Sequence, residues 1–306
     1  MMSNYPQQVS IVEVGARDGL QNEASVIELP VKLAFIDGLL RAGLKRIEAG
    51  SFVSPKWVPQ MADSAAVFNG LPQHSDATFS ALTPNEKGML AAIDAGVDEV
   101  AVFAAASESF SQRNINCSIE QSLQRFDPVF RLARQHNLRV RGYVSCVMGC
   151  PYEGAISPDA VLAVSQTLLD KGCYEISLGD TIGTGTPGQT AQLLSTLLKT
   201  IPVSKLAVHF HDTYGQALAN ILVALQHGIS VIDSAAGGLG GCPYAAGASG
   251  NVATEDVVYM LNGMGIDCGV DINALVAAST QIFEHLNREP ASRSMRALMA
   301  KLNNVI

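Results

Sequence analysis

The sequence has no long apolar runs and carries little charge. Of its 306 residues, 16% are charged and 48% are hydrophobic, which is too little charge for disorder and enough apolar material for one large core. The longest apolar stretches are only as long as a strand, whereas a membrane-spanning helix needs about 20 apolar residues. Residues 1–8 lack the apolar segment of a signal peptide. We therefore expect a globular protein without a membrane partner.

Basic clusters and regularly spaced cysteines are also missing. The net charge is −8, and no run of lysine or arginine suggests a nucleic-acid partner. The six cysteines are scattered, and the spacing of Cys146 and Cys150 matches neither a zinc finger nor a redox motif. Free thiols in a reducing cytoplasm are the simplest interpretation, so we expect a cytoplasmic protein.

The sequence does contain a regular alternation of short β-rich runs with amphipathic helical segments. The predicted strands span 9–15, 46–52, 77–82, 99–106, 139–147, 174–179, 206–211 and 231–236. The clearest helices between them span 30–42, 84–95, 118–136, 158–171, 187–200 and 215–226. Eight such units fill the chain and predict an α/β fold of the (β/α)8 TIM-barrel type, with a doubly wound open sheet as the main alternative.

Further helices are predicted beyond the eighth strand, at 253–264, 273–286 and 292–302. They make an additional C-terminal region, about 253–306, that could cover one end of the barrel or form the contact of a homodimer. No linker or low-complexity stretch divides the chain, and α/β barrels of this length are single domains. We therefore expect one catalytic domain over residues 1–306.

The segment from His209 to Asp212 closes an apolar run, 206–208, that is typical of a buried strand. Side chains alternate across a strand, so His209 and His211 point to the same face. Two imidazoles on one face make half of a metal site. Two ordinary half-buried histidines would give the same local pattern, so the rest of the chain must decide between them.

Polar residues gather at the ends of nearly all the predicted strands. In a TIM barrel the active site lies at the C-terminal ends of the strands, so these residues can converge on one point. They are Glu13, Arg17, Asp18 and Gln21 at the first strand, Glu48 on the second, Tyr143 on the fifth, Asp180 and Thr181 at the sixth, His209, His211 and Asp212 on the seventh, and Asn251 after the eighth.

Four of these residues form a mixed oxygen and nitrogen ligand set: Asp18, His209, His211 and Asn251. One carboxylate, two imidazoles and one amide leave two octahedral positions for water or substrate. This set suits Mg²⁺ or Mn²⁺, and Zn²⁺ stays open. Asn251 could instead cap the helix that follows it, which is a common use of asparagine.

The charged residues around this set are candidates for substrate binding and proton transfer. Arg17 can hold a substrate carboxylate or enolate oxygen beside the metal, or it can form a salt bridge to Glu48 or Glu13. Glu48 or Asp180 can accept a proton, or can orient the ligand histidines.

Two glycine-rich segments have different predicted uses. Residues 237–241 lead to Cys242, which could act as acid or base at the tip of a mobile loop or could be a passive buried thiol. Residues 183–188 match the G-x-G-x-x-G pattern of dinucleotide sites but follow the sixth predicted strand rather than the first. We interpret them as a loop that leads into a helix N-terminus, and expect no nicotinamide cofactor.

With these residues in view, the chain resembles the 3-hydroxy-3-methylglutaryl-CoA lyase family, which belongs to a superfamily of metal-dependent barrel lyases and synthases. The matching segments are 13–23 (EVGARDGLQNE), 51–61 (SFVSPKWVPQM), 114–118 (NINCS), 141–146 (RGYVSC), 177–183 (SLGDTIG), 209–220 and 238–256. The Arg-Asp-Gly turn at 17–19 and the His-x-His-Asp at 209–212 are shared across the superfamily. The segment 238–244 (GLGGCPY) is far more specific to the lyases.

The resemblance implies a role for each candidate residue. Asp18, His209, His211 and Asn251 would bind the divalent metal, and Arg17 would stabilise an enolate or hold the thioester oxygen. Cys242 would be the catalytic loop cysteine, Glu48, Asp180 and His209 would assist proton transfer, and Gln21, Asn114, Tyr143 and Thr181 would lie near an acyl-CoA substrate. The reaction would break the C2–C3 bond of 3-hydroxy-3-methylglutaryl-CoA to give acetoacetate and acetyl-CoA, as in leucine degradation.

Three other functions compete with this interpretation. A lyase for a longer branched substrate, such as 3-hydroxy-3-isohexenylglutaryl-CoA, would share the same motifs. A condensing synthase of the superfamily would have additional C-terminal regions and would lack the Cys242 loop. A barrel that binds metal without turnover would have no reason to collect so many polar residues at its strand ends.

Overall fold

Eight parallel strands close into a barrel in the computed structural model, which describes residues 5–23, 25–72, 76–241 and 250–303. The strands are β1 (Ser10–Glu13), β2 (Arg46–Ser51), β3 (Thr78–Leu82), β4 (Glu99–Ala105), β5 (Arg139–Ser145), β8 (Cys173–Asp180), β9 (Leu206–Phe210) and β10 (Val231–Ser234). Their order around the barrel is β1-β10-β9-β8-β5-β4-β3-β2. The predicted TIM barrel is confirmed, and each predicted strand overlaps an observed one.

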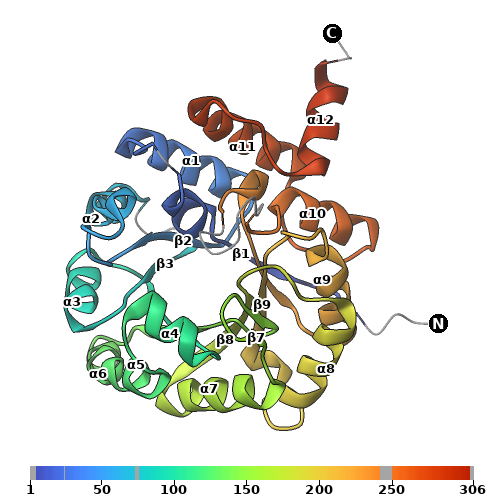
Figure 1. The fold of residues 1–306 in the computed structure, drawn as a ribbon. Helices are drawn as coiled ribbons and strands as arrows, with labels where there is room; N and C mark the ends of the chain where they lie inside the picture. The colour runs from blue at the N-terminus through green and yellow to red at the C-terminus, as the bar shows by residue number, and fades with distance from the viewer. Residues whose placement is uncertain (1–4, 24, 73–75, 242–249, 304–306) are drawn as a thin grey trace.

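The strands are apolar because helices cover the outside of the barrel, as expected for an all-parallel sheet. In β9 every residue is buried. The surrounding helices are α1 (Leu29–Arg41), α2 (Ser64–Gly70), α3 (Glu86–Asp94), α4 (Glu108–Ile115), α5 (Ile119–Arg125), α6 (Asp127–Gln135), α7 (Pro158–Lys171), α8 (Pro187–Leu197) and α9 (Ala217–Gln226). Figure 1 shows them as a ring around the strands.

One predicted helix, 118–136, is broken in the structure. It consists of α5 and α6, which meet at Phe126. Pro128 explains the break, because its ring has no N–H to donate and clashes with the carbonyl four residues earlier. Three further features were not predicted from the sequence: α2, α4 and the small antiparallel hairpin of β6 (Gly149–Cys150) and β7 (Gly154–Ala155) that follows β5.

The predicted C-terminal helices are present as α10 (Thr254–Gly263), α11 (Ile272–Leu286) and α12 (Arg293–Asn303). In Figure 1 α11 lies beside α1 and packs against it, while α10 and α12 lie next to α11. Gly38 allows this close approach, because a Cβ at that position would lie 2.8 Å from the Cβ of Ala278. Within the described ranges, no helix is both long and apolar enough to cross a membrane.

Short helical turns complete the connections at the strand ends. They are η1 (Gly15–Gly19), a π-helical turn after β1, and the 3-10 turns η2 (Pro59–Met61), η3 (Val203–Lys205) and η4 (Ala236–Gly238). Single π-turns occur often at functional sites. Both η1 and η4 lie at the C-terminal end of the barrel, where the polar residues collect.

Candidate active site

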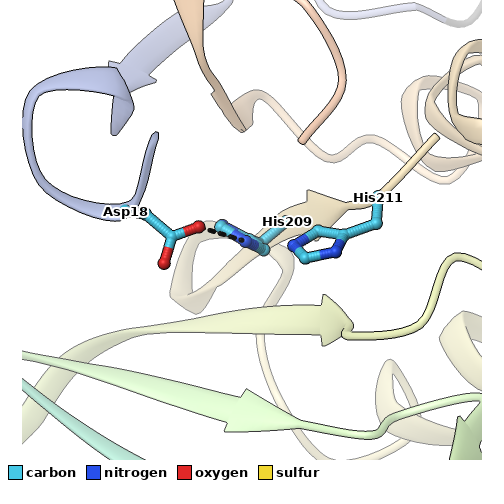
Figure 2. A group of neighbouring side chains, drawn as sticks. All are labelled: Asp18, His209 and His211. Atoms are coloured by element: carbon cyan, nitrogen blue, oxygen red, sulfur yellow. Dashed lines mark ion pairs between the residues drawn. The ribbon is translucent and has the colours of Figure 1, made fainter. Parts of the chain in front are cut away.

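Two elements bring a carboxylate and two imidazoles together. The turn η1 carries Asp18, and β9 and the residue after it carry His209 and His211 (Figure 2). One ligand atom from each of the three residues lies within 4.8 Å of the others. The predicted alternation along the strand therefore places both imidazoles on the face that meets Asp18, and this group is a candidate metal centre.

The electrostatics of the three residues favour a bound cation. Burial alone would raise the pKa of the Asp18 carboxyl, but Arg17 and both imidazoles outweigh it and lower the pKa to about 2. Burial, helped by His209, lowers the pKa of His211 to about 4. The buried Nδ1 of His211 has no hydrogen-bond partner among the described residues. An ionised carboxylate beside a neutral imidazole is the donor set that a divalent metal requires, so the residues fit one.

Asn251 lies against this group and does not cap a helix. Its backbone forms an isolated β-bridge with His211, and its amide Nδ2 donates to Asp18 Oδ2 at 2.9 Å. The N-cap of α10 is Ala253, which makes no side-chain capping bond. The capping alternative is therefore wrong, and the amide is placed beside the carboxylate.

Arg17 is buried and joins Asp18 to Glu48. Its Nη1 donates to Asp18 Oδ1 at 2.6 Å, and its Nε donates to Glu48 Oε2 at 2.6 Å. Its Cζ lies 5.8 Å from the centre of the Tyr143 ring. Of the two salt-bridge partners considered from the sequence, Glu48 is confirmed and Glu13 is wrong, because Glu13 binds the backbone of Gly15 instead.

Tyr143 and Asp180 approach the group from β5 and β8. The Tyr143 ring meets the His209 ring edge-on, with centroids 5.8 Å apart. The Asp180 Oδ2 accepts a hydrogen bond from the backbone of Gly185 at 2.8 Å. Its Oδ1 is buried with no partner among the described residues, and burial raises the pKa of this carboxyl to about 6. Asp180 can therefore hold or release a proton near neutral pH.

The other predicted residues lie around the same end of the barrel or outside the description. Thr181 follows β8, and its Oγ1 accepts a hydrogen bond from the backbone of Cys146 at 2.9 Å. Gln21 is half-buried, two residues after η1, and Asn114 is exposed near the end of α4. Cys242, the predicted loop cysteine, lies outside the described residues.

The family model described as HMGL-like matches residues 8–282. The chain belongs to the HMGL-like family. It is 59% identical to the 3-hydroxy-3-isohexenylglutaryl-CoA/hydroxy-methylglutaryl-CoA lyase of Pseudomonas aeruginosa, over 97% of this chain and 99% of that one. It is 58% identical to the mitochondrial hydroxymethylglutaryl-CoA lyase of Bos taurus, over 97% and 91% of the two chains.

A solved structure supports the same relationship. The crystal structure of hydroxymethylglutaryl-CoA lyase from Pseudomonas aeruginosa is similar to this chain with a TM-score of 0.96 at 59% identity. The similarity covers 97% of this chain and 99% of that one. This chain therefore has the fold of that lyase over nearly its whole length.

Two residues beneath the histidines of this HMGL-like protein were not predicted from the sequence. Asp233, on β10, has Oδ2 3.3 Å from Nδ1 of His209, and Arg141 binds both of its oxygens. Burial alone would raise the pKa of Asp233, but Arg141 and His209 outweigh it and hold the pKa well below its usual range. A carboxylate inside an apolar strand must have a partner. Asp233 could therefore have been singled out, although its partner could not.

The start of the glycine-rich segment 237–241 is fixed by two buried carboxylates. Glu13 Oε1 accepts from the backbone N–H of Ala236 at 2.9 Å, and Glu255 Oε2 accepts from that of Gly237 at 2.7 Å. Burial raises the pKa of each carboxyl to about 7. Gly237 has φ +64°, a conformation that glycine adopts without strain. In this HMGL-like barrel, two buried carboxylates thus fix the backbone of η4, the turn at the start of the segment that leads to Cys242.

The second glycine-rich segment has the predicted place in the fold. Residues 183–188 follow β8 and run into the first turn of α8. Thr186 is the N-cap of α8 and forms a capping box with Gln189. The segment therefore leads into a helix N-terminus, as expected.

Proposed function

We propose that this protein is a divalent-metal-dependent lyase that cleaves 3-hydroxy-3-methylglutaryl-CoA to acetoacetate and acetyl-CoA. The observation that carries the proposal is the group of Asp18, His209 and His211, with Arg17 bound to its carboxylate, at the C-terminal end of an HMGL-like barrel. The names of relatives at 58% and 59% identity over nearly the whole chain give the substrate class.

The metal would be held by Asp18, His209, His211 and Asn251, and we propose Mg²⁺ or Mn²⁺. When bound, such an ion acts as a Lewis acid that polarises substrate oxygens and lowers the pKa of a hydroxyl. The Asp18 carboxyl is already ionised because its pKa is about 2, so binding needs no proton to leave it. A neutral imidazole at His211 serves the same purpose.

Arg17 would hold the oxygen on which negative charge develops. Breaking the C2–C3 bond leaves the electron pair on the thioester side, as an enolate of acetyl-CoA, while C3 becomes the ketone carbonyl of acetoacetate. A guanidinium that is already fixed by Glu48 and Asp18 does not need to reorganise as that charge appears. The buried ion pair with Glu48 is therefore a positioning contact for Arg17.

Proton transfer would involve His209, Asp180 and Glu48 at the start and Cys242 at the end. Asp180 or Glu48 takes the proton of the C3 hydroxyl, while His209 assists as a metal ligand. Asp180 suits this use because its pKa is about 6. The enolate carbon must then gain a proton before acetyl-CoA leaves, and we assign this donation to Cys242. Gln21, Asn114, Tyr143 and Thr181 would contact the substrate.

The Cys242 assignment predicts a separation between metal binding and turnover. We expect Cys242→Ser to keep the metal affinity of the wild type and to lose most of kcat, because the hydroxyl is a much poorer proton donor. Metal titration and initial rates on the same preparation check this prediction. An equal loss in both quantities would contradict the proton-donor role.

The proposal extends to the domain, the compartment and the partners of the protein. We propose that residues 1–306 act as one catalytic domain in the cytoplasm, with acyl-CoA as the small-molecule partner and leucine degradation as the process served. We also propose a homodimer, because α10–α12 place additional helices on one side of the barrel.

A longer branched substrate is the second candidate, because the name of the Pseudomonas aeruginosa relative includes the isohexenyl compound. The test compares kcat/KM for 3-hydroxy-3-methylglutaryl-CoA and 3-hydroxy-3-isohexenylglutaryl-CoA, with the disappearance of each acyl-CoA substrate measured. We expect cleavage of the methyl compound at least as efficient as that of the longer one. Cleavage of the longer compound alone would replace the substrate, and cleavage of neither would overturn the proposed function.

A further inference from the structure

We propose that Asp233, held by Arg141 and Ser177, is a positioning residue that fixes the orientation and tautomer of His209. The inference concerns the lower layer of the barrel rather than the ligands themselves. It rests on the metal centre proposed above, since it states what prepares one of its imidazoles to bind a cation.

The strand pairing places Asp233 directly beside His209. β9 and β10 are adjacent and parallel, and these two residues are partners in the register. Nδ1 of His209 lies 3.3 Å from Asp233 Oδ2. An ionised carboxylate can only accept hydrogen bonds, so Nδ1 must carry the proton and donate it. The lone pair of the neutral ring is then on Nε2, which lies 3.9 Å from Asp18 Oδ2.

Asp233 is itself fixed on both oxygens. Arg141 donates from Nη2 to Oδ1 at 2.7 Å and from Nη1 to Oδ2 at 2.9 Å, in a two-pronged contact. Ser177, on β8, donates to Oδ2 at 2.7 Å. Two parallel N–H···O bonds set the plane of a carboxylate as well as its position. The direction in which Asp233 presents Oδ2 to His209 is therefore determined by β5 and β8.

Stability alone does not explain a charged pair in this place. Arg141 and Asp233 are each 1% exposed, and the interior of a TIM barrel is usually filled with branched apolar side chains. Replacing a buried ion pair by apolar residues of similar volume is often neutral or stabilising, because charges are costly to desolvate. An ion pair that contacts a candidate metal ligand is better explained by control of that ligand.

A change at Asp233 should therefore reach the metal through His209. In Asp233→Asn the neutral amide no longer favours a proton on Nδ1, and its NH₂ group can donate to Nδ1 instead. The proton then moves to Nε2 and occupies the lone pair that a cation needs. Loss of such an outer partner typically weakens metal binding by roughly 10- to 100-fold.

The first measurement uses the metal-free wild type, so it does not depend on the folding of any variant. Long-range ¹H–¹⁵N NMR at alkaline pH distinguishes the two neutral tautomers of each imidazole, and His209→Gln identifies the signal. We expect the Nδ1–H tautomer for His209. Finding the Nε2–H tautomer would overturn the inference.

The second measurement compares Mn²⁺ affinity, from the electron paramagnetic resonance signal of free Mn²⁺, in the wild type, Asp233→Asn and Glu175→Gln. Glu175 is the matched control, because it binds the same guanidinium through Arg141 Nε at 2.7 Å and is also buried. We expect a 10- to 100-fold loss in Asp233→Asn, and an unchanged affinity with a lower melting temperature in Glu175→Gln.

The outcomes separate this inference from the proposed function. Equal Mn²⁺ affinity in the wild type and Asp233→Asn would overturn the positioning role and leave the metal centre intact. An equal loss in Glu175→Gln would also overturn it, because the effect would then belong to the ion network as a whole. Absence of Mn²⁺ binding by the wild type would overturn the metal centre and this inference together.

Discussion

At the scale of single residues, the candidate site depends on charges that are held in fixed positions before any ligand arrives. Arg17 shows this most clearly, since it contacts the Asp18 carboxylate at one end and the buried Glu48 at the other. The proposed role of Arg17, holding an oxygen on which negative charge develops, depends on both contacts.

Arg17→Gln should therefore lower kcat much more than it lowers metal affinity. Removing one fixed donor to a developing oxyanion costs roughly 100- to 1000-fold in kcat, whereas the four proposed metal ligands stay in place. Steady-state rates at saturating Mg²⁺ and a Mg²⁺ titration of each protein give the two numbers. A variant with normal kcat would show that Arg17 serves only as a salt-bridge partner.

At the scale of residues, only part of the candidate site could be predicted from the sequence. Alternation along an apolar strand was enough to place His209 and His211 on one face, and the rule that strand ends converge was enough to bring Asp18 to them. The contact from Asp233 to His209 was not predictable, because periodicity says which residues face the interior but not which of them meet. Cys242 lies outside the described residues, so its role stays a prediction.

At the scale of elements, the strands were predictable from the sequence, whereas the short turn that carries Asp18 was not. Strands were predictable because buried parallel strands have near-continuous runs of apolar residues. The π-helical turn η1 was not predictable, because its five residues, GARDG, resemble an ordinary loop. The break between α5 and α6 was missed because apolar spacing continues across Pro128, although the proline itself was the signal.

The turn η4 provides a test of how buried carboxylates affect stability with pH. The folded pKa of Glu13 is about 7 and its ordinary value is 4.5, so between these values the folded state holds a proton that the unfolded state has lost. Stability contributed by this group is therefore fully present below pH 4.5 and falls as the pH rises to about 7. The size of the effect is about 3 kcal/mol, from 1.36 kcal/mol for each pKa unit.

Glu13→Gln should remove this dependence and keep the hydrogen bonds. The amide oxygen can accept from Gly15 and Ala236, and the NH₂ group can donate to Thr254, which now donates to Glu13. We expect the free energy of unfolding of the variant, relative to the wild type, to increase from pH 4.5 to 7 and then level off. Urea unfolding at several pH values measures the difference, and a pH-independent difference would contradict the burial effect.

At the scale of the whole molecule, the fold brings distant parts of the sequence to one end of a barrel. Asp18 and Asn251 are 233 residues apart in sequence and share a hydrogen bond. The C-terminal helices α11 and α12 lie on the same side as α1 (Figure 1). A metal held by η1, by β9 with the residue after it, and by the segment after β10 would therefore link the start of the barrel to its end.

This arrangement predicts that metal binding stabilises the entire fold. A ligand that binds only the folded state contributes about 2.7 kcal/mol when it is present at 100 times its Kd. The melting temperature should therefore rise with Mg²⁺ or Mn²⁺ in the wild type, and this rise should be lost in Asp18→Asn. Calorimetry of both proteins, with and without the metal, checks the prediction, and an equal rise in the variant would place the ion elsewhere.

The most direct test of the central claim is the release of acetoacetate from 3-hydroxy-3-methylglutaryl-CoA by the purified protein, measured with Mg²⁺, after EDTA, and after Mg²⁺ is restored. We predict turnover that disappears with EDTA, returns with the metal, and is absent in a folded Asp18→Asn variant. Turnover that survives complete removal of the metal, or a folded and metal-loaded wild type that releases no acetoacetate, would contradict the account.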